Sequence, residues 1–267
     1  FAAALLWLAA ASPALAALDA ASTAATIRAA VERNYPKLDA LYKDIHAHPE
    51  LAFQETRTAA KLANAMRELG FEVTEKVGGT GVVAILRNGD GPVVMVRTEL
   101  DALPMEEKTG LPYASHEKTI WNGRETFVAH SCGHDIHMAV WVGAASELAE
   151  LKNRWHGTLM FVAQPAEEIV HGAKAMLKDG LYTRFPKPNV AFALHVAPFA
   201  NDAISFAPGI RTSNSDQLEI SFHGRGGHGS APDKTIDPVV TAAHFVTDIQ
   251  SVLAREKNPA EFGVLTF

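Results

Sequence analysis

A cysteine and two histidines gather in residues 132–137, which read Cys-Gly-His-Asp-Ile-His. The glycine permits a turn that brings the Cys132 thiolate and the His134 imidazole into one small volume. Thiolate and imidazole together suit zinc, and nickel, cobalt or manganese when carboxylates join them. The alternative interpretation is a small buried cysteine with incidental histidines.

Two adjacent carboxylates, Glu167 and Glu168, directly follow an apolar segment. Neighbouring carboxylates repel each other unless a cation or a proton compensates. Because neighbouring side chains point apart, one can bind a metal while the other faces substrate and holds a proton. This division suits a metal-assisted hydrolase with one ligand and one general base. The alternative is a solvated pair in a loop.

Three further polar residues end predicted strands: Glu99, Asp101 and His195. Glu99 and Asp101 occupy alternate positions, share a face, and are placed to orient a histidine ligand. Each has a plain alternative, which is an exposed loop start for the two carboxylates and a satisfied core residue for His195. The position of all the clusters beside strand ends or helix starts favours a common site.

The elements that must position these residues alternate between strand and helix. Hydrophobic periodicity predicts helices over residues 34–47, 55–69, 135–151 and 172–178. Strands are predicted over residues 71–77, 81–86, 93–100, 158–163 and 190–196, with a hairpin turn at 88–91. This alternation predicts an α/β fold.

The pattern changes near Ser205. Residues 217–222 alternate apolar and polar, which predicts a half-exposed strand, and residues 237–253 predict an amphipathic helix. Residues 263–267 predict another strand. The sequence therefore predicts a second, smaller α+β module that begins here.

Composition limits the remaining possibilities. The 267 residues are 48% apolar and carry a net charge of −6, which argues against a nucleic-acid partner. A single cysteine excludes an internal disulfide.

The first residues, 1–17, form an apolar run that ends in small residues, as in a secretory signal peptide. The prediction is export to the periplasm or medium, with no stable membrane span in the mature protein. The alternatives are an Ala-rich helix on the core and a cytoplasmic location. Because the far end stops in an apolar run, we also expect the chain to be a fragment.

Five motifs in order resemble the M20 metallopeptidase family, closest to its branch of hippurate hydrolases, auxin-conjugate hydrolases and N-acyl-amino-acid deacylases. They are HAHPEL (46–51), ELDALPM (99–105), CGHD (132–135), QPAEE (164–168) and GGHGSAP (226–232). The resemblance implies an α/β catalytic domain with a mixed sheet flanked by helices, over residues 18–206. It also implies an inserted smaller α+β dimerisation and lid domain, incomplete here, over residues 207–267, and hence a homodimer.

The resemblance also implies a chemistry: a bound water activated by two divalent metal ions (Zn, Mn, Co or Ni) cleaves the amide bond of an N-acyl amino acid or small peptide-like substrate. Glu167 would be the base, Asp101 the supporting carboxylate, and His228 would reach substrate, in the partner subunit's site. The implied metal ligands are Cys132, His134, Glu168 and His195.

Two departures from the family pattern stand out. Glu99 occupies a position where the family usually has Asp. The family's return to the catalytic domain after the lid, with one more histidine ligand, is absent, so we expect these 267 residues alone to be inactive and poorly stable. Two other functions stay open: a cysteine hydrolase with Cys132 as nucleophile and His134 or His137 as base, and a non-catalytic homologue that binds acyl amino acids or peptides.

Overall fold

The computed structural model describes residues 20–267 except 201–202, 207 and 210–215. The chain divides into two compact units, with the boundary between Pro198 and Phe199. The predicted signal peptide lies outside the described residues. Among the helices described, none combines the length and hydropathy that a membrane span requires.

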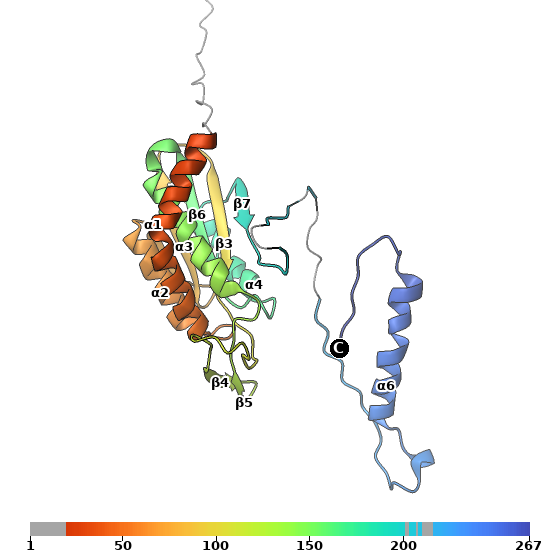
Figure 1. Ribbon diagram of the computed structural model, residues 1–267. Helices are drawn as coiled ribbons and strands as arrows, with labels where there is room; N and C mark the ends of the chain where they lie inside the picture. The colour runs from red at the N-terminus through yellow and green to blue at the C-terminus, as the bar shows by residue number, and fades with distance from the viewer. Residues whose placement is uncertain (1–19, 201–202, 207, 210–215) are drawn as a thin grey trace, which may run out of the picture. The chain divides into compact units, whose positions relative to one another are not determined.

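A five-stranded mixed sheet forms the centre of the first unit, in the order β1-β2-β6-β3-β7. Strands β6, β3 and β7 are labelled in Figure 1. The β1–β2 and β2–β6 pairs are antiparallel, whereas β6–β3 and β3–β7 are parallel. The strands are β1 (Glu72–Val77), β2 (Gly81–Asn88), β3 (Val93–Glu99), β6 (Gly157–Gln164) and β7 (Val190–Ala193). A separate two-stranded ribbon pairs β4 (Lys118–Trp121) with β5 (Arg124–Phe127).

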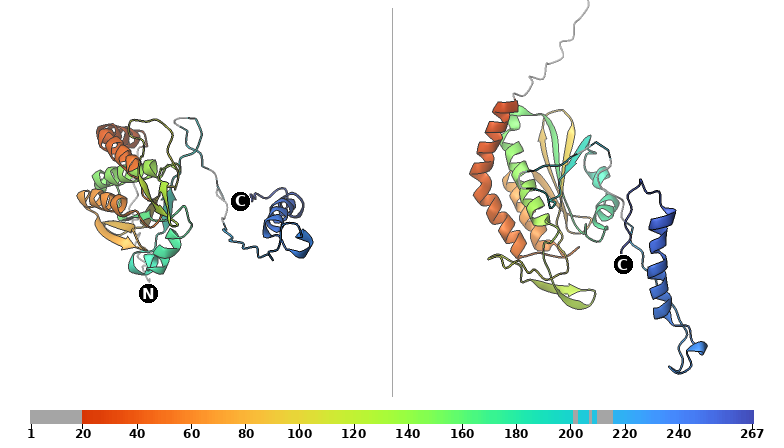
Figure 2. Two further views of the ribbon diagram at one scale, coloured as in Figure 1. Left: turned by 90° about the horizontal axis from the view of Figure 1, so that it is seen from below. Right: turned by 45° about the vertical axis from the view of Figure 1, so that its right-hand side comes forward.

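Helices cover both faces of this sheet (Figure 2). On one face lie α1 (Ala20–Ala47), α2 (Thr56–Glu68) and α3 (His134–Glu150), which bury Leu62, Trp141 and Phe161 in one apolar cluster. On the other lie α4 (Gly172–Lys178) and α5 (Leu181–Arg184), where Met176 packs on Val162 in a second cluster. The predicted α/β class, a mixed sheet flanked by helices, is confirmed.

The predicted hairpin between β2 and β3 is wrong, because β6 lies between these two strands. β6 is almost entirely buried, so it is most stable with a partner on each side. The chain bends at residues 89–91 and crosses the start of β6, so that Asn88 pairs with Gly157 on one side and Val93 pairs with Thr158 on the other. Gly157 makes this possible, since a Cβ there would meet the Pro92 carbonyl oxygen at 2.4 Å.

The predicted start of the first helix at Asn34 is also wrong, because α1 begins at Ala20 and continues through Pro36. The Asn34 side chain does not cap a helix; its amide donates to Glu147 Oε1 of α3 at 3.0 Å. Packing of α1 along α3 therefore outweighs the one helix hydrogen bond that Pro36 cannot make.

The edge strand β7 ends at Ala193, so His195 follows that strand instead of closing it.

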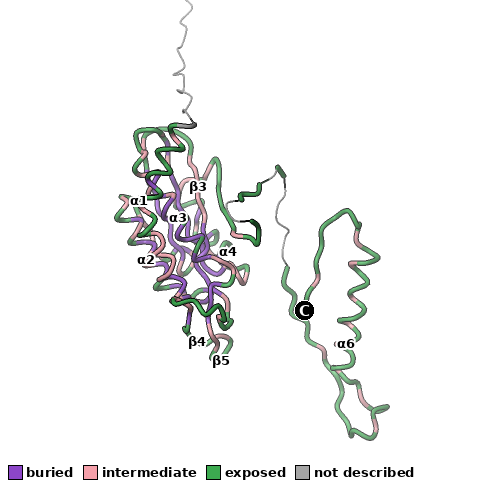
Figure 3. Tube along the Cα trace, viewed as in Figure 1, coloured by how far each residue is buried: buried purple, intermediate pink, exposed green. Residues whose placement is uncertain are grey.

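The second unit contains α6 (Pro238–Asp248), which the Asp237 carboxylate caps by accepting from Val239 N at 2.8 Å. The strands predicted over 217–222 and 263–267 are not found there. A strand needs a hydrogen-bonded neighbour, and these two segments do not pair with each other. None of this unit's described residues is buried (Figure 3).

Candidate metal centre

The parallel strands explain why distant residues meet. Strands β6, β3 and β7 run in the same direction, so the residues after them gather at one edge of the sheet. Asp101 follows β3, Glu167 and Glu168 follow β6, and His195 follows β7. The N-terminus of α3 carries His134 to the same edge.

Gly133 shapes the turn before α3. Its φ of +81° lies in the left-handed region, and a Cβ there would meet Val196 Cγ2 at 2.3 Å. A side chain here would be strained by this backbone conformation and would displace the Val196 side chain, so glycine is favoured. Cys132 and His134 are thereby brought together on either side of it, as the sequence predicted from the same residue.

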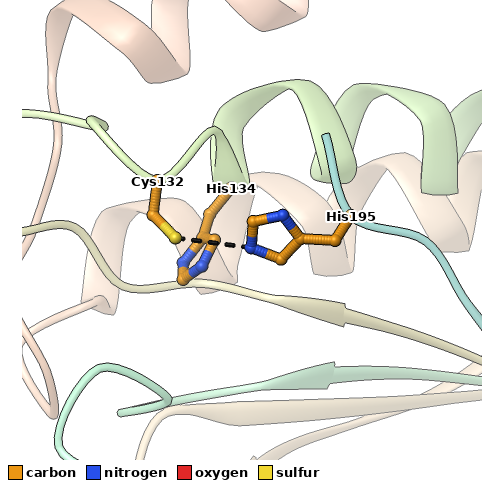
Figure 4. Close-up of side chains that lie close together, drawn as sticks. All are labelled: Cys132, His134 and His195. Carbon is orange, nitrogen blue, oxygen red and sulfur yellow. Dashed lines mark hydrogen bonds between the residues drawn. The ribbon is translucent and has the colours of Figure 1, made fainter. Parts of the chain in front are cut away.

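Cys132, His134 and His195 form the first group of possible ligands (Figure 4). Their donor atoms all lie within 4.8 Å of one another, and Cys132 Sγ is 3.4 Å from His195 Nε2. Two such ligands on a tetrahedral zinc ion would be about 3.4–3.6 Å apart. The spacing therefore fits a shared cation.

His134 also joins the two carboxylates in a second group. Its Nε2 is 3.7 Å from Glu167 Oε2 and 3.8 Å from Glu168 Oε1. Both His134 Nε2 and Glu168 Oε1 are buried without a hydrogen-bond partner. Buried polar atoms are normally paired, so these two atoms and their spacing fit a cation between them.

Asp101 fixes the orientation of the His134 side chain and the position of the Glu168 backbone. Its carbonyl oxygen is 2.7 Å from His134 Nδ1, which assigns the proton to Nδ1 and leaves Nε2 as an acceptor facing the carboxylates. Its carboxylate accepts from Glu168 N at 2.9 Å. The predicted role of Asp101 as the supporting carboxylate stays a prediction.

Glu99 and His137 lie near the site as a third group with His134, but their atoms already have protein partners. Glu99 Oε2 accepts from His137 Nδ1 at 3.0 Å, and His137 Nε2 accepts from Val196 N at 2.9 Å. His137 therefore holds the backbone beside His195. This role of His137 was not predicted from the sequence, although the three-residue spacing from His134 puts both rings on one helix face.

The surroundings of Cys132 decide its protonation in the absence of a cation. Burial and the neighbouring carboxylate of Glu168 raise the pKa of the thiol to about 12. At neutral pH such a thiol is a poor nucleophile. A divalent cation would reverse this effect by supplying positive charge to the thiolate.

A pocket of about 370 Å³ opens beside these side chains. Its lining includes Tyr42, His46, His130, Cys132 and His195. This volume suits a small organic molecule. His228 belongs to the second unit, where its Nδ1 lies 2.8 Å from Ser230 Oγ, and its role toward substrate stays a prediction.

The sheet of this α/β fold carries possible metal ligands at the carboxyl ends of its parallel strands. This combination is that of a metal-binding protein. Residues 95–262 match Peptidase family M20/M25/M40, so the chain belongs to this family. The resemblance seen in the sequence is thus confirmed.

Three similar proteins illustrate this membership. The chain is 39% identical to hippurate hydrolase of Campylobacter jejuni over 224 residues, 83% of the chain and 56% of that relative. It is 37% identical over 235 residues to N-acetyldiaminopimelate deacetylase of Oceanobacillus iheyensis, covering 86% and 60%. The solved Bacillus subtilis YXEP protein, a dinuclear metal binding peptidase from the M20 family, shares 35% identity at TM-score 0.56, covering 62% and 44%. The chain therefore spans little more than half the length of the two curated relatives and less than half of the solved one.

Proposed function

We propose that this protein is a metal-dependent amidohydrolase acting on N-acyl amino acids or small peptide-like substrates. The proposal rests on one observation. Cys132 and His195, and also the carboxylate pair of Glu167 and Glu168, lie around the buried imidazole of His134. The names of the relatives support the substrate class, since one hydrolyses hippurate and another deacetylates N-acetyldiaminopimelate.

Four residues would hold two divalent cations: Cys132, His134, Glu168 and His195. Zinc, manganese, cobalt and nickel all suit this mixture of sulfur, nitrogen and oxygen donors. When bound, the cations would polarise the scissile carbonyl and lower the pKa of a water molecule toward neutrality. Asp101 keeps His134 in the tautomer that a ligand needs and holds the backbone of Glu168.

Glu167 is the proposed base. Its side chain is more exposed than that of Glu168 (39% against 18%), so it can reach substrate while Glu168 faces the cations. It would take a proton from the attacking water and pass it to the departing amine. His228 would donate a hydrogen bond to the developing oxyanion from the partner subunit.

The remaining parts of the chain have proposed roles in assembly and export. We assign residues 18–206 to the catalytic domain and 207–267 to a lid that mediates homodimerisation. Exposed apolar side chains of the second unit, such as Leu218 and Val239, support an association surface. Residues 1–17 would direct export.

The test is metal analysis and an amidase screen on protein expressed from the complete reading frame, with N-acetyl, N-benzoyl and indoleacetyl amino acids. We expect two bound metal ions per chain and hydrolysis that a chelator stops and added metal restores. Hydrolysis that survives chelation but not thiol alkylation would instead establish a cysteine hydrolase. Tight binding of these compounds without product would establish a non-catalytic homologue.

A further inference from the structure

Glu55 is a buried carboxylate that the proposed mechanism does not use. It immediately precedes α2 and is fully inaccessible to solvent. Its side chain does not cap that helix. The cap comes instead from Glu50, which accepts from Thr58 N at 2.7 Å. Glu55 is therefore free to serve a different part of the chain.

Two hydrogen-bond partners of the Glu55 carboxylate lie far away in sequence, in addition to the nearby backbone N–H groups of Phe53 and of Glu55 itself. Glu55 Oε1 accepts from the backbone N–H of Ala166 at 2.8 Å, across 111 positions. Glu55 Oε2 accepts from the Thr80 hydroxyl. Burial raises the pKa of Glu55, and these hydrogen bonds oppose that rise. The side chain thus joins the start of α2 to the segment that carries the carboxylate pair.

Ala166 is an unusual residue to anchor in this way. It is fully buried and has a φ of +48°, in the left-handed region that residues with a Cβ seldom adopt. Its carbonyl oxygen accepts from Gly172 N at 3.0 Å, which closes the turn. A strained conformation of this kind persists only where surrounding contacts enforce it.

Asp101 acts on the same segment from the other side. It accepts the N–H of Glu168, while Glu55 accepts the N–H of Ala166. Two fully buried carboxylates therefore hold the backbone on both sides of Glu167. Nothing comparable is needed for a solvated loop, since water would satisfy those N–H groups.

We propose that Glu55 is a positioning residue: by accepting the Ala166 N–H it holds the left-handed turn that presents Glu167 to the metal centre. The importance of this turn for turnover rests on the proposed function, but the hydrogen bond itself does not. What matters is the reach of the side chain and its acceptor oxygen, not its charge.

Two variants distinguish the effect of the length of the Glu55 side chain from the effect of its charge. Glu55→Gln keeps an acceptor at the same distance and can donate its amide to Thr80. Glu55→Asp keeps the charge but is one methylene shorter. We expect Glu55→Gln to retain kcat within about threefold and Glu55→Asp to lower it about 30-fold, with KM and bound metal nearly unchanged in both. Ala166→Gly in the Glu55→Asp background should recover part of kcat, because glycine adopts the turn without strain.

The matched control is Glu50→Asp, which shortens the carboxylate that caps the same helix. It should lower the melting temperature slightly and leave kcat unchanged. Hydrogen exchange provides a readout that needs no activity: Glu55→Asp should accelerate exchange at the Ala166 amide, and Glu55→Gln should not. If the wild-type protein hydrolyses no amide, the proposed function fails while this measurement still tests the positioning.

Three results would overturn the proposal. The first is wild-type kcat and wild-type exchange at Ala166 in Glu55→Asp. The second is a loss of kcat in Glu55→Gln with kcat retained in Glu55→Asp, which would make the charge responsible. The third is a fall in melting temperature with kcat per metal-loaded molecule unchanged, which would make the role purely structural.

Discussion

The two units of this protein differ in how far their apolar residues are buried. In the first unit, a five-stranded sheet buries both faces under helices, and the candidate site lies where three parallel strands end. In the second, α6 and its neighbouring segments leave every described residue at least partly exposed. Side chains can be held within a few ångströms only by elements that themselves have partners. We therefore expect metal binding and proton transfer to depend on the first unit, and association to depend on the second.

The largest expected effect is the loss of the base. Glu167→Gln should lower kcat by about 10³-fold or more, because an amide cannot accept the proton of the attacking water. Metal content should stay at the wild-type level. Activity and bound metal, measured on the same preparation, check both statements.

Glu168→Gln is the matched variant for this comparison. Because Glu168 is a proposed ligand and Glu167 is not, we expect the Glu168 change to weaken metal binding as well as turnover. If Glu167→Gln kept the turnover of the wild-type protein, Glu167 would not be the base.

A pair of phenylalanine truncations compares the two units directly. Phe161 is fully buried in β6, whereas Phe262 is 76% exposed. Phe161→Ala should lower the free energy of unfolding by about 3–5 kcal/mol, through lost burial and the cavity that remains. Phe262→Ala should change it by less than about 0.5 kcal/mol. Denaturant titration of dilute protein measures both; a large cost at Phe262 would show that a partner covers the second unit.

The smallest expected effect concerns a buried histidine beside the pocket. His46 Nδ1 lies 2.6 Å from Asp135 Oδ2, and its Nε2 lies 3.0 Å from Glu107 Oε1. Burial alone would lower the pKa of His46, but its hydrogen bonds with these two carboxylates outweigh burial and raise the pKa above 6.5.

This raised pKa sets the direction of a pH dependence. Stabilisation by the charged imidazole is complete below the unfolded-state pKa and is lost as pH rises through the higher folded-state value. His46→Gln should therefore destabilise the protein more at pH 6 than at pH 9, by about 1 kcal/mol. His48→Gln, which removes a half-exposed imidazole two residues later, is the control. An equal loss at both pH values would contradict the assignment.

The sequence predicted those parts of the molecule that local pattern and motif order determine. The turn at Gly133 and the clusters after β3 and β6 follow from short segments, because parallel strands bring their carboxyl ends to one edge. The positions of Cys132, His134 and Glu168 therefore agree with expectation, although their role as ligands stays a prediction.

The errors all involve contacts between distant segments. The hairpin after β2 failed because β6, about 70 residues later in the chain, takes the place beside β2. Asn34 has the residue type of a helix cap, but its amide bonds to α3. Residues 217–222 have the alternation of a strand and 263–267 are mostly apolar, but neither segment has a pairing partner among the described residues. Local pattern specifies which conformation a segment favours, but not which neighbour is available.

In the proposed site, Cys132 binds a cation together with the neighbouring imidazoles. The most direct measurement is the absorption spectrum of the cobalt-substituted protein, with Cys132→Ser alongside. We expect stoichiometric uptake of cobalt and a thiolate-to-cobalt charge-transfer band that disappears in Cys132→Ser. Failure to bind cobalt, or a spectrum that the substitution leaves unchanged, would contradict it.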